Sequence, residues 1–136
     1  MKKVMVFGTF DGIHEGHRAF FKEAKTHGDY LMAVVAQDHI VKHLKGHLPA
    51  INLEERFRLL NAEDGVDEVI VGDPTVGTWN VVREYHPEVV AVGYDQNLLK
   101  ENLETHLQDF NWPLEVVKLS AYEPDKYHTS KLITNN

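Results

Sequence analysis

The strongest constraint on the fold is an alternation of short apolar segments with segments of helical periodicity. Apolar runs occupy residues 4–8, 29–36, 67–72, 88–96 (ending at Gly93) and 114–120, and each is typical of a strand buried on both faces. Residues 15–27, 53–63, 76–86 and 97–110 place apolar side chains at helical spacing. The pattern predicts one α/β domain over residues 1–136, a Rossmann-like doubly wound fold with a five-stranded parallel sheet and helices on both faces.

Two further segments have weaker patterns. Residues 41–50, VKHLKGHLPA, are polar and basic and contain glycine and proline, so we expect a loop there. A short helix is expected to begin near Thr129. We find no repeat and no linker, which agrees with a single domain of 136 residues.

Composition excludes several classes of function. The formal charge of -7 argues against nucleic acid as the main partner. The chain has no cysteine, which rules out disulfides, thiolate nucleophiles and cysteine-based metal sites. No apolar run approaches the ~20 residues that span a bilayer, and the first run is too short for a signal peptide. We therefore expect a cytoplasmic protein with no membrane partner.

The predicted sheet fixes where a ligand would bind. In doubly wound sheets, ligands occupy the crevice beyond the carboxyl ends of the strands, where the strand order reverses. Three segments follow strand ends and carry polar residues: GTFDGIHEGH at 8–17, GYDQ at 93–96 and SAYEPDKYHTS at 120–130. We expect these segments to form the site.

The stretch GTFDGIHEGH matches no common phosphate loop. It lacks the spacing of a Walker loop and of the dinucleotide fingerprint GxGxxG. His14 and His17 are also one residue too close for the HExxH metal motif. Such a pair can bind a metal, but no third ligand is adjacent, so we assign no metal ligand. The alternative without function is a glycine-rich turn with incidental histidines, since the chain has nine.

The position of this stretch between a strand and a helix favours phosphate binding. A helix N-terminus presents N–H groups and the positive end of a dipole to anions. Gly8 and Gly12 are expected to let the backbone approach a ligand, and Gly16 to let a nucleotide pack against the first turn. His14 and His17 lie on one side of that turn and can both donate hydrogen bonds to phosphate oxygens, with pKa values lowered by the dipole.

GTFDGIHEGH resembles the GTFDxxHxGH signature of the cytidylyltransferase-like nucleotidyltransferases, a branch of the HxGH superfamily. The chain is most similar to the archaeal-type FAD synthases, with matching stretches along nearly its whole length: EAKTHGDYLMAVVAQD, HLKGHLP, LEERFRLL, VDEVIVGD, PEVVAVGYDQ and TSKLI. Glycerol-3-phosphate cytidylyltransferases are the next most similar group. Their RTEGIS-type motif contains an arginine, whereas the corresponding EPDKYHTS here has none. Two other departures are His47, where the family often has arginine, and the absence of the C-terminal cysteines that some archaeal relatives have.

The resemblance implies transfer of a nucleoside monophosphate from a nucleoside triphosphate to a phosphate-bearing acceptor, with release of pyrophosphate. The expected reaction is AMP transfer from ATP to FMN, giving FAD; the alternative is CTP with glycerol 3-phosphate. Mg²⁺ is expected to enter with the triphosphate. A nucleotide-binding module without turnover is a third possibility, from another class of function. The resemblance also makes a homodimer possible, with Trp79 or Trp112 exposed for pairing.

The resemblance assigns roles to residues of the first turn and of the 41–50 segment. His14 and His17 bind phosphates during catalysis, and Lys45 is the phosphate-binding lysine, with Lys42 as its rival; either lysine could instead be solvated. Arg56 binds phosphate or pairs with Glu54 or Glu63. The remaining nucleotide contacts in the first turn are Gly8, Thr9, Phe10, Glu15 and Gly16.

Four residues beyond strands four and five complete the expected site. Asp95 accepts ribose hydroxyls or caps the following helix. Tyr122 stacks on the adenine or packs in the protein. Thr129 and Ser130 bind phosphate at a helix start, or one of them is a simple N-cap.

Overall fold

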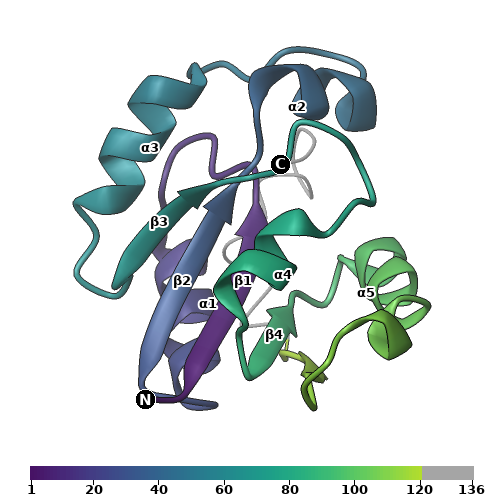
Figure 1. The fold of residues 1–136 in the computed structure, drawn as a ribbon. Coiled ribbons are helices and arrows are strands. Elements are labelled where there is room, and N and C mark those ends of the chain that lie inside the picture. Colours follow the sequence, from purple (N-terminus) through teal and green to yellow (C-terminus); the bar gives the residue numbers. More distant parts are fainter. Residues whose placement is uncertain (121–136) are drawn as a thin grey trace.

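The computed structural model describes residues 1–120, and within them five parallel strands form one sheet (Figure 1). The order across the sheet is β3-β2-β1-β4-β5. The chain thus builds outward from β1 in one direction and then crosses to the other side with β4. The strands are β1 (Lys3–Gly8), β2 (Tyr30–Val35), β3 (Glu68–Val71), β4 (Val89–Val92) and β5 (Glu115–Lys118).

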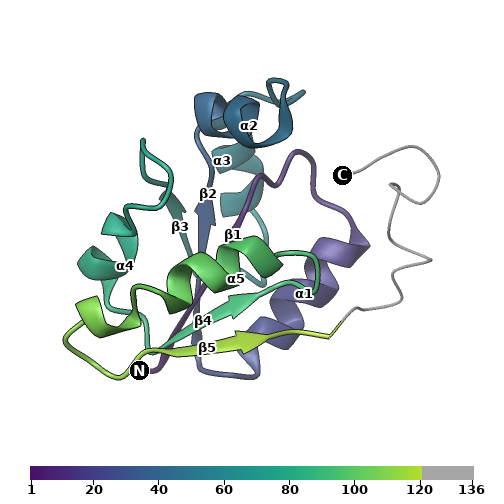
Figure 2. The ribbon, with the colours of Figure 1, turned by 90° about the vertical axis from the view of Figure 1, so that its right-hand side faces the viewer.

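Helices cover both faces of the sheet (Figure 2). One face packs against α1 (Glu15–Lys25) and α3 (Leu53–Asn61), with Phe21 and Leu60 in the shared core. The other packs against α4 (Asn80–Tyr85) and α5 (Asn97–Glu104), with Val82 and Leu103 buried. The buried residues of the two central strands, Val4–Val6 and Leu31–Val35, are all apolar because both faces are covered. The predicted fold class is confirmed.

The strand order reverses between β1 and β4, and the two strands are paired for only part of their length. The register joins Val4 to Val89 and Met5 to Val90, near the start of β1. On its other side β1 pairs with β2 along all of Lys3–Gly8. The carboxyl ends of β1 and β4 therefore lie beyond their ladder, at the point where such folds bind ligands.

The expectation of a loop over residues 41–50 is wrong in its first half. Asp38–Lys45 form the helix α2, which ends at Gly46 with φ of 83°, a left-handed conformation that glycine adopts without strain. Val41 is the buried residue of this helix. The surrounding lysines and histidines obscured a short helix whose stop signal, a glycine directly after Lys45, is present in the sequence.

Two other helices are shorter than predicted, and the tryptophans differ from expectation. The helix over 76–86 begins at Asn80, and the helix over 97–110 ends at Glu104 before a 3-10 turn at Leu107–Asp109.

Trp79 is buried and donates through Nε1 to Asn102, and half-buried Trp112 donates to the Pro87 carbonyl. Trp79 is therefore not available for pairing on the surface.

No helix in residues 1–120 has the length and apolar character needed to cross a membrane. The predicted helix near Thr129 lies outside the described residues, as do Tyr122, Thr129 and Ser130.

Candidate active site

The two histidines of GTFDGIHEGH cap the N-terminus of α1 and hold each other in place. His14 is the N-cap residue, and its Nδ1 accepts a hydrogen bond from the Gly16 amide at 3.0 Å. The Nδ1 of His17 in turn accepts from the His14 amide at 3.2 Å. The pair thus forms a capping box built from imidazoles. Their ring centroids lie 4.0 Å apart, on one side of the turn as the spacing predicts.

This capping arrangement sets the protonation of both rings. A backbone N–H can only donate, so each Nδ1 must be the unprotonated acceptor nitrogen. The ring proton is then on Nε2, which is the nitrogen able to donate to a ligand. The backbone of the turn therefore fixes two imidazoles in the same donor tautomer.

His17 is neutral at physiological pH. Burial is the largest cause that lowers the pKa of its imidazole to about 4, and the neighbouring His14 and Lys45 act in the same direction. Glu63, whose own pKa is lowered by hydrogen bonds from Arg18, opposes this effect but does not outweigh it. We expected the helix dipole to be the cause, whereas the largest cause is burial.

Phe10 packs against His17, and its ring explains why residue 8 is a glycine. Phe10 is buried and has φ of 52°, a strained value for a side chain of this size. Its ring packs edge-on against His17 with centroids 5.7 Å apart. A Cβ on Gly8 would come within 2.8 Å of this ring. Gly8 therefore makes room for Phe10. At Gly12, φ is 99° and a Cβ would meet no atom within 4 Å, and the close approach of a ligand stays a prediction.

The other predicted residues of the turn lie around the histidines. The Thr9 carbonyl accepts a hydrogen bond from Arg56 at 2.7 Å. The Gly16 amide is taken by His14. The Glu15 side chain pairs with Arg18 at 2.8 Å on the surface.

Lys42 and Lys45 are both exposed residues of α2. This helix lies at the same end of the molecule as the β1–α1 turn (Figure 1). They differ in their relation to the histidines. The charge of Lys45 acts on His17 and contributes to its lowered pKa. Lys45 is also the last residue of α2, directly before the left-handed Gly46.

Arg56 has neither of the predicted carboxylate partners. Its side chain is fully buried and pairs with Asp38 at 2.6 Å, while Glu63 pairs with Arg18. Its Nε and Nη1 donate to the carbonyls of Ile51 and Thr9. The guanidinium is thus occupied by protein acceptors, which makes it part of the scaffold under the turn.

Asp95 lies exposed in the connection between β4 and α5, across the strand-order reversal from the histidines. It is not the N-cap of α5, because Gln96 occupies that position. The Gln96 side chain accepts from the Gly93 amide at 2.8 Å and donates to the Phe7 carbonyl at 2.9 Å. It therefore joins the ends of β4 and β1 where their ladder has stopped.

Sequence analysis missed Asp11, Asp38 and Gln96. Asp11 accepts hydrogen bonds from the Ala50 and Ile51 amides, both at 2.8 Å. Each of the three follows an apolar segment and stands within a stretch already singled out or next to one. This position beside strand ends could have marked them as candidate site residues. Their hydrogen-bond partners are distant in sequence, so only the folded chain shows the contacts.

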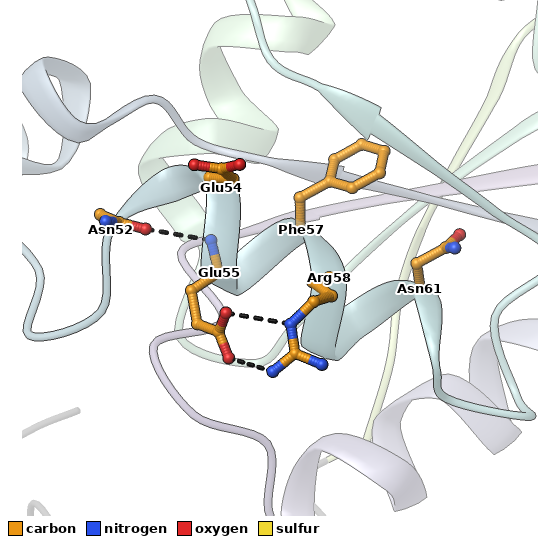
Figure 3. A pocket seen from close by; sticks show the side chains of 6 residues that line it. All are labelled: Asn52, Glu54, Glu55, Phe57, Arg58 and Asn61. Atoms are coloured by element: carbon orange, nitrogen blue, oxygen red, sulfur yellow. Dashed lines mark hydrogen bonds and ion pairs between the residues drawn. The ribbon is translucent and has the colours of Figure 1, made fainter.

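Two hollows lie on the surface beside α1 and α3. One is on the outer side of α3, lined by Asn52, Glu54, Glu55, Phe57, Arg58 and Asn61, and contains the Glu55–Arg58 ion pair (Figure 3). The other lies between α1 and the end of α3. Neither is lined by His14, His17 or Lys45. Within residues 1–120, no group of three or more His, Asp or Glu side chains is arranged to hold a metal ion.

Comparison with known proteins shows the family of the chain. Residues 5–135 match the family model described as cytidylyltransferase-like. Because the match covers most of the chain, the protein belongs to the cytidylyltransferase-like family.

Individual proteins similar to this chain include FAD synthases and one solved structure. The chain is 38% identical over 132 residues to a FAD synthase of Thermococcus sibiricus, covering 96% of this chain and 89% of the relative. It is 42% identical over 123 residues to a FAD synthase of Ferroglobus placidus, covering 90% and 79%. A crystal structure described as a lipopolysaccharide core biosynthesis protein from Thermoplasma volcanium superposes with a TM-score of 0.83 at 31% identity, over 90% of this chain and 99% of that one.

Proposed function

We propose that this protein transfers AMP from ATP to FMN, forming FAD and pyrophosphate. The observation that carries the proposal is the backbone-fixed histidine pair at the end of β1, beside the reversal of strand order. The FAD synthases similar over most of the chain supply the identity of the substrates. The site supplies the chemistry: donors for phosphate oxygens, and a lysine whose charge acts on His17.

The reaction needs no protein nucleophile. An oxygen of the FMN phosphate attacks the α-phosphorus of ATP and forms the new P–O bond. The bond between the α-phosphorus and the bridging oxygen to the β-phosphate breaks, and pyrophosphate leaves with that electron pair. The protein must align the two anions and stabilise negative charge on the transferred group and the leaving group.

The histidines are suited to the transferred phosphate. Both rings are held by amides of the turn, so their Nε2–H donors need no reorientation during the reaction. His17 is neutral, so it donates a hydrogen bond without giving up a proton at pH 7. Preorganised donors of this kind typically accelerate such reactions by about 10²–10³ each.

We assign the phosphate-binding lysine to Lys45 rather than Lys42. Support comes from its charge acting on His17 and from its place at the end of α2. The long exposed stem lets the ammonium reach a triphosphate beside the turn. Asp95, across the reversal point, is proposed to accept the ribose hydroxyls; the roles of Tyr122, Thr129 and Ser130 stay predictions from the resemblance.

Mg²⁺ is proposed to arrive with the triphosphate as part of the substrate. The described residues provide no cluster that could form a protein cage for it. Mg²⁺ commonly keeps several waters and binds through substrate phosphates, where it neutralises their charge. The possible homodimer also stays a prediction, for size-exclusion chromatography with light scattering to test.

The direct test is an incubation of the purified protein with ATP, Mg²⁺ and FMN, followed by chromatographic separation of flavins. We expect FAD and an equal amount of pyrophosphate. Parallel reactions pair CTP with glycerol 3-phosphate and exchange the nucleotides. Pyrophosphate release with CTP and glycerol 3-phosphate but none with ATP and FMN would overturn the substrate assignment. Binding of ATP and FMN without turnover would favour a regulatory module.

A further inference from the structure

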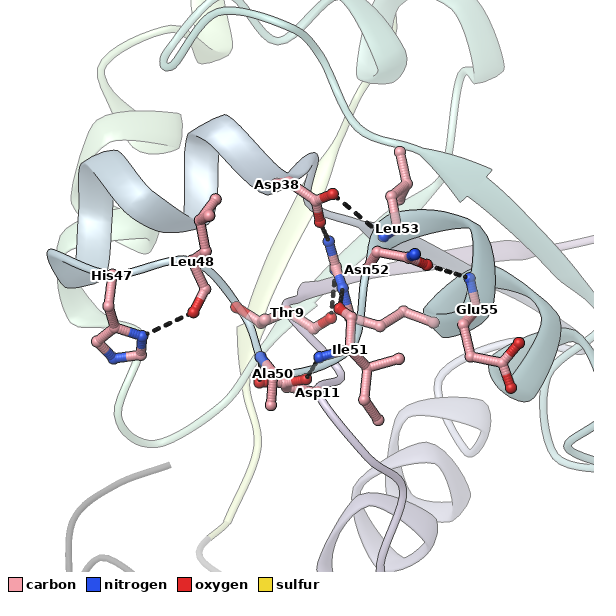
Figure 4. A network of polar contacts seen from close by, with 11 residues as sticks. Thr9, Asp11, Asp38, His47, Leu48, Ala50, Ile51, Asn52, Leu53 and Glu55 are labelled. Atoms are coloured by element: carbon pink, nitrogen blue, oxygen red, sulfur yellow. Dashed lines mark hydrogen bonds and ion pairs between the residues drawn. The ribbon is translucent and has the colours of Figure 1, made fainter.

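Arg56 is the one charged side chain among residues 1–120 that is fully buried. Its three nitrogens contact three separate segments: Nε donates to the Ile51 carbonyl at 2.8 Å, Nη1 to the Thr9 carbonyl at 2.7 Å and Nη2 to Asp38 at 2.6 Å. Figure 4 labels these three acceptor residues. Burying a guanidinium is costly unless its donors are all matched, and here they hold together the β1–α1 turn, the start of α2 and the residue before α3's cap.

Asp11 makes a second link between the same segments. It is exposed in the β1–α1 turn, and its two carboxylate oxygens accept hydrogen bonds from the Ala50 and Ile51 amides, each at 2.8 Å (Figure 4). Residue 51 is therefore held from both sides, by Asp11 at its N–H and by Arg56 at its carbonyl. Residues 50 and 51, which belong to no helix or strand, thereby gain a defined position.

These links hold the start of α2 and the segment that follows the helix. Asp38 is the first residue of α2 and pairs with Arg56, and its second oxygen faces the Leu53 amide at 3.4 Å. Past the other end of α2, residues 50 and 51 are tied to Asp11. Val41 is the buried side chain of this eight-residue helix, so apolar packing gives it little support. Polar contacts add to it: Asp38 pairs with Arg56, which also holds the Thr9 carbonyl of the β1–α1 turn, and His39 Nε2 donates to the Pro74 carbonyl at 2.8 Å.

We propose that Arg56 and Asp11 are positioning residues that fix α2, and with it Lys45, relative to His14 and His17. The inference rests on the proposed function, because it gives the lysine and the histidines one shared phosphate substrate. It also reassigns Arg56 from a phosphate ligand to a support: its donors are engaged by the protein, and its side chain has no exposed surface.

The kinetic test is a double-mutant cycle between Asp11→Ala and Lys45→Ala in the full chain, measured as FAD formation. We expect each single change to lower kcat/KM by about tenfold, and the double variant to be little worse than either. The physical reason is that a lysine no longer held beside the phosphates has little left to contribute. Effects that multiply would show that Asp11 does not act through the lysine and would overturn the proposal.

Asp64→Ala is the matched control. It removes another exposed aspartate, in the turn between α3 and β3, away from the β1–α1 turn. We expect its kcat/KM and its coupling to Lys45→Ala to show no change, so that a drop with Asp11→Ala reports the link rather than a lost surface charge.

Amide hydrogen exchange tests the positioning without relying on activity. In the unaltered protein, the amides of residues 50 and 51 should exchange slowly although they lie in a connecting segment. In Asp11→Ala their exchange, and that of α2, should rise by at least about tenfold, with no change in Asp64→Ala. Unchanged exchange would overturn the proposal. If the protein makes no FAD but exchange rises as expected, the proposed substrates fail while the structural link stands.

The variant Arg56→Lys tests the role of Arg56, the buried one of the two positioning residues. Lysine keeps the charge but cannot reach three acceptors at once. We expect a kcat/KM loss coupled to Lys45→Ala in the same way. Should this variant fail to fold, Asp38→Asn replaces it, because that side chain is partly exposed and an amide oxygen still accepts from Nη2. Independent, multiplying losses in the folded variant would contradict the role of Arg56.

Discussion

The β1–α1 turn and α2 both supply groups to the proposed phosphate site, but they are built differently. In the turn, His17 is largely buried, its Nδ1 is held by a backbone amide, and its ring packs on a strained Phe10. On α2, Lys42 and Lys45 are exposed, and the helix is held to the rest by polar contacts of Asp38 and His39 and by the segment after it.

The difference matches two demands of the reaction. Charge that develops on the transferred phosphate is best met by donors fixed beforehand at short range. A triphosphate and a second anion must also be drawn together, and a flexible ammonium can do this over a longer distance. We infer that the turn lowers the barrier of the chemical step, whereas α2 contributes more to binding.

The sharpest test of this contrast is His17→Ala. Removing the preorganised donor should lower kcat by about 10²–10³, while the KM for ATP changes less, because the donor matters most in the transition state. Steady-state kinetics with ATP and FMN measure both. His27→Ala, just past the far end of α1, is the control and should behave like the unaltered protein. Unchanged turnover of His17→Ala would remove the histidine from the mechanism.

The neutral state of His17 predicts a particular pH dependence of stability. Its pKa is about 4 in the folded protein against 6.5 when unperturbed, so between these values the unfolded chain binds the proton and the folded one does not. The free energy of unfolding should therefore fall as the pH drops from 6.5 to 4, by about 3 kcal/mol from this residue.

Urea unfolding at pH 7 and near pH 4 measures this loss. His17→Gln cannot titrate, so its free energy of unfolding should fall by correspondingly less over the same interval. An equal loss in both proteins would mean that His17 is not the titrating group, and the turn would then not hold its imidazole neutral.

On α2, the two lysines should separate. Lys45→Ala is expected to raise the KM for ATP by about tenfold, with a smaller effect on kcat, because a charge clamp acts in the bound ground state as well as the transition state. Lys42→Ala is the matched control on the same helix and should change KM by less than about twofold. The reverse ranking would assign the phosphate to Lys42.

The smallest expected effect concerns the support of the turn. Gly8→Ala places a methyl group 2.8 Å from the Phe10 ring and should destabilise the protein by about 1–3 kcal/mol. Thermal or urea unfolding measures this. In the double variant with Phe10→Leu, the added methyl group should cost less than it does beside phenylalanine. Equal costs in both backgrounds would show that Gly8 does not serve to accommodate this ring.

The sequence predicted the sheet and the turn well because both depend on local pattern. Buried strands read as continuous apolar runs, and the glycines and histidines of the turn lie within ten residues. Helix α2 was missed because a single buried residue, Val41, gives no periodic signal. From the sequence, we explained Gly8 by the close approach of a ligand. The structural reason is the Phe10 ring, whose position depends on a left-handed backbone that the sequence does not reveal.

The role of Arg56 could not be predicted because its partners come from three places. Glu54 and Glu63 were the nearby candidates in sequence, yet the pairing is with Asp38 and with carbonyls of Thr9 and Ile51. Long-range polar contacts of this kind depend on which segments the completed fold brings together. They set the geometry of the site and leave little trace in local spacing.

The proposed mechanism requires the β1–α1 turn to hold neutral imidazoles whose Nε2–H groups donate to the substrate phosphates. Nitrogen-15 NMR of histidine-labelled protein tests it directly, with a nonhydrolysable ATP analogue and Mg²⁺ as the ligand. At pH 7 we expect the Nε2–H tautomer for His17 and a ligand-induced shift at its Nε2, with Nδ1 little changed. A protonated Nδ1 in the free protein, or an Nε2 resonance unaffected by saturating ligand, would contradict it.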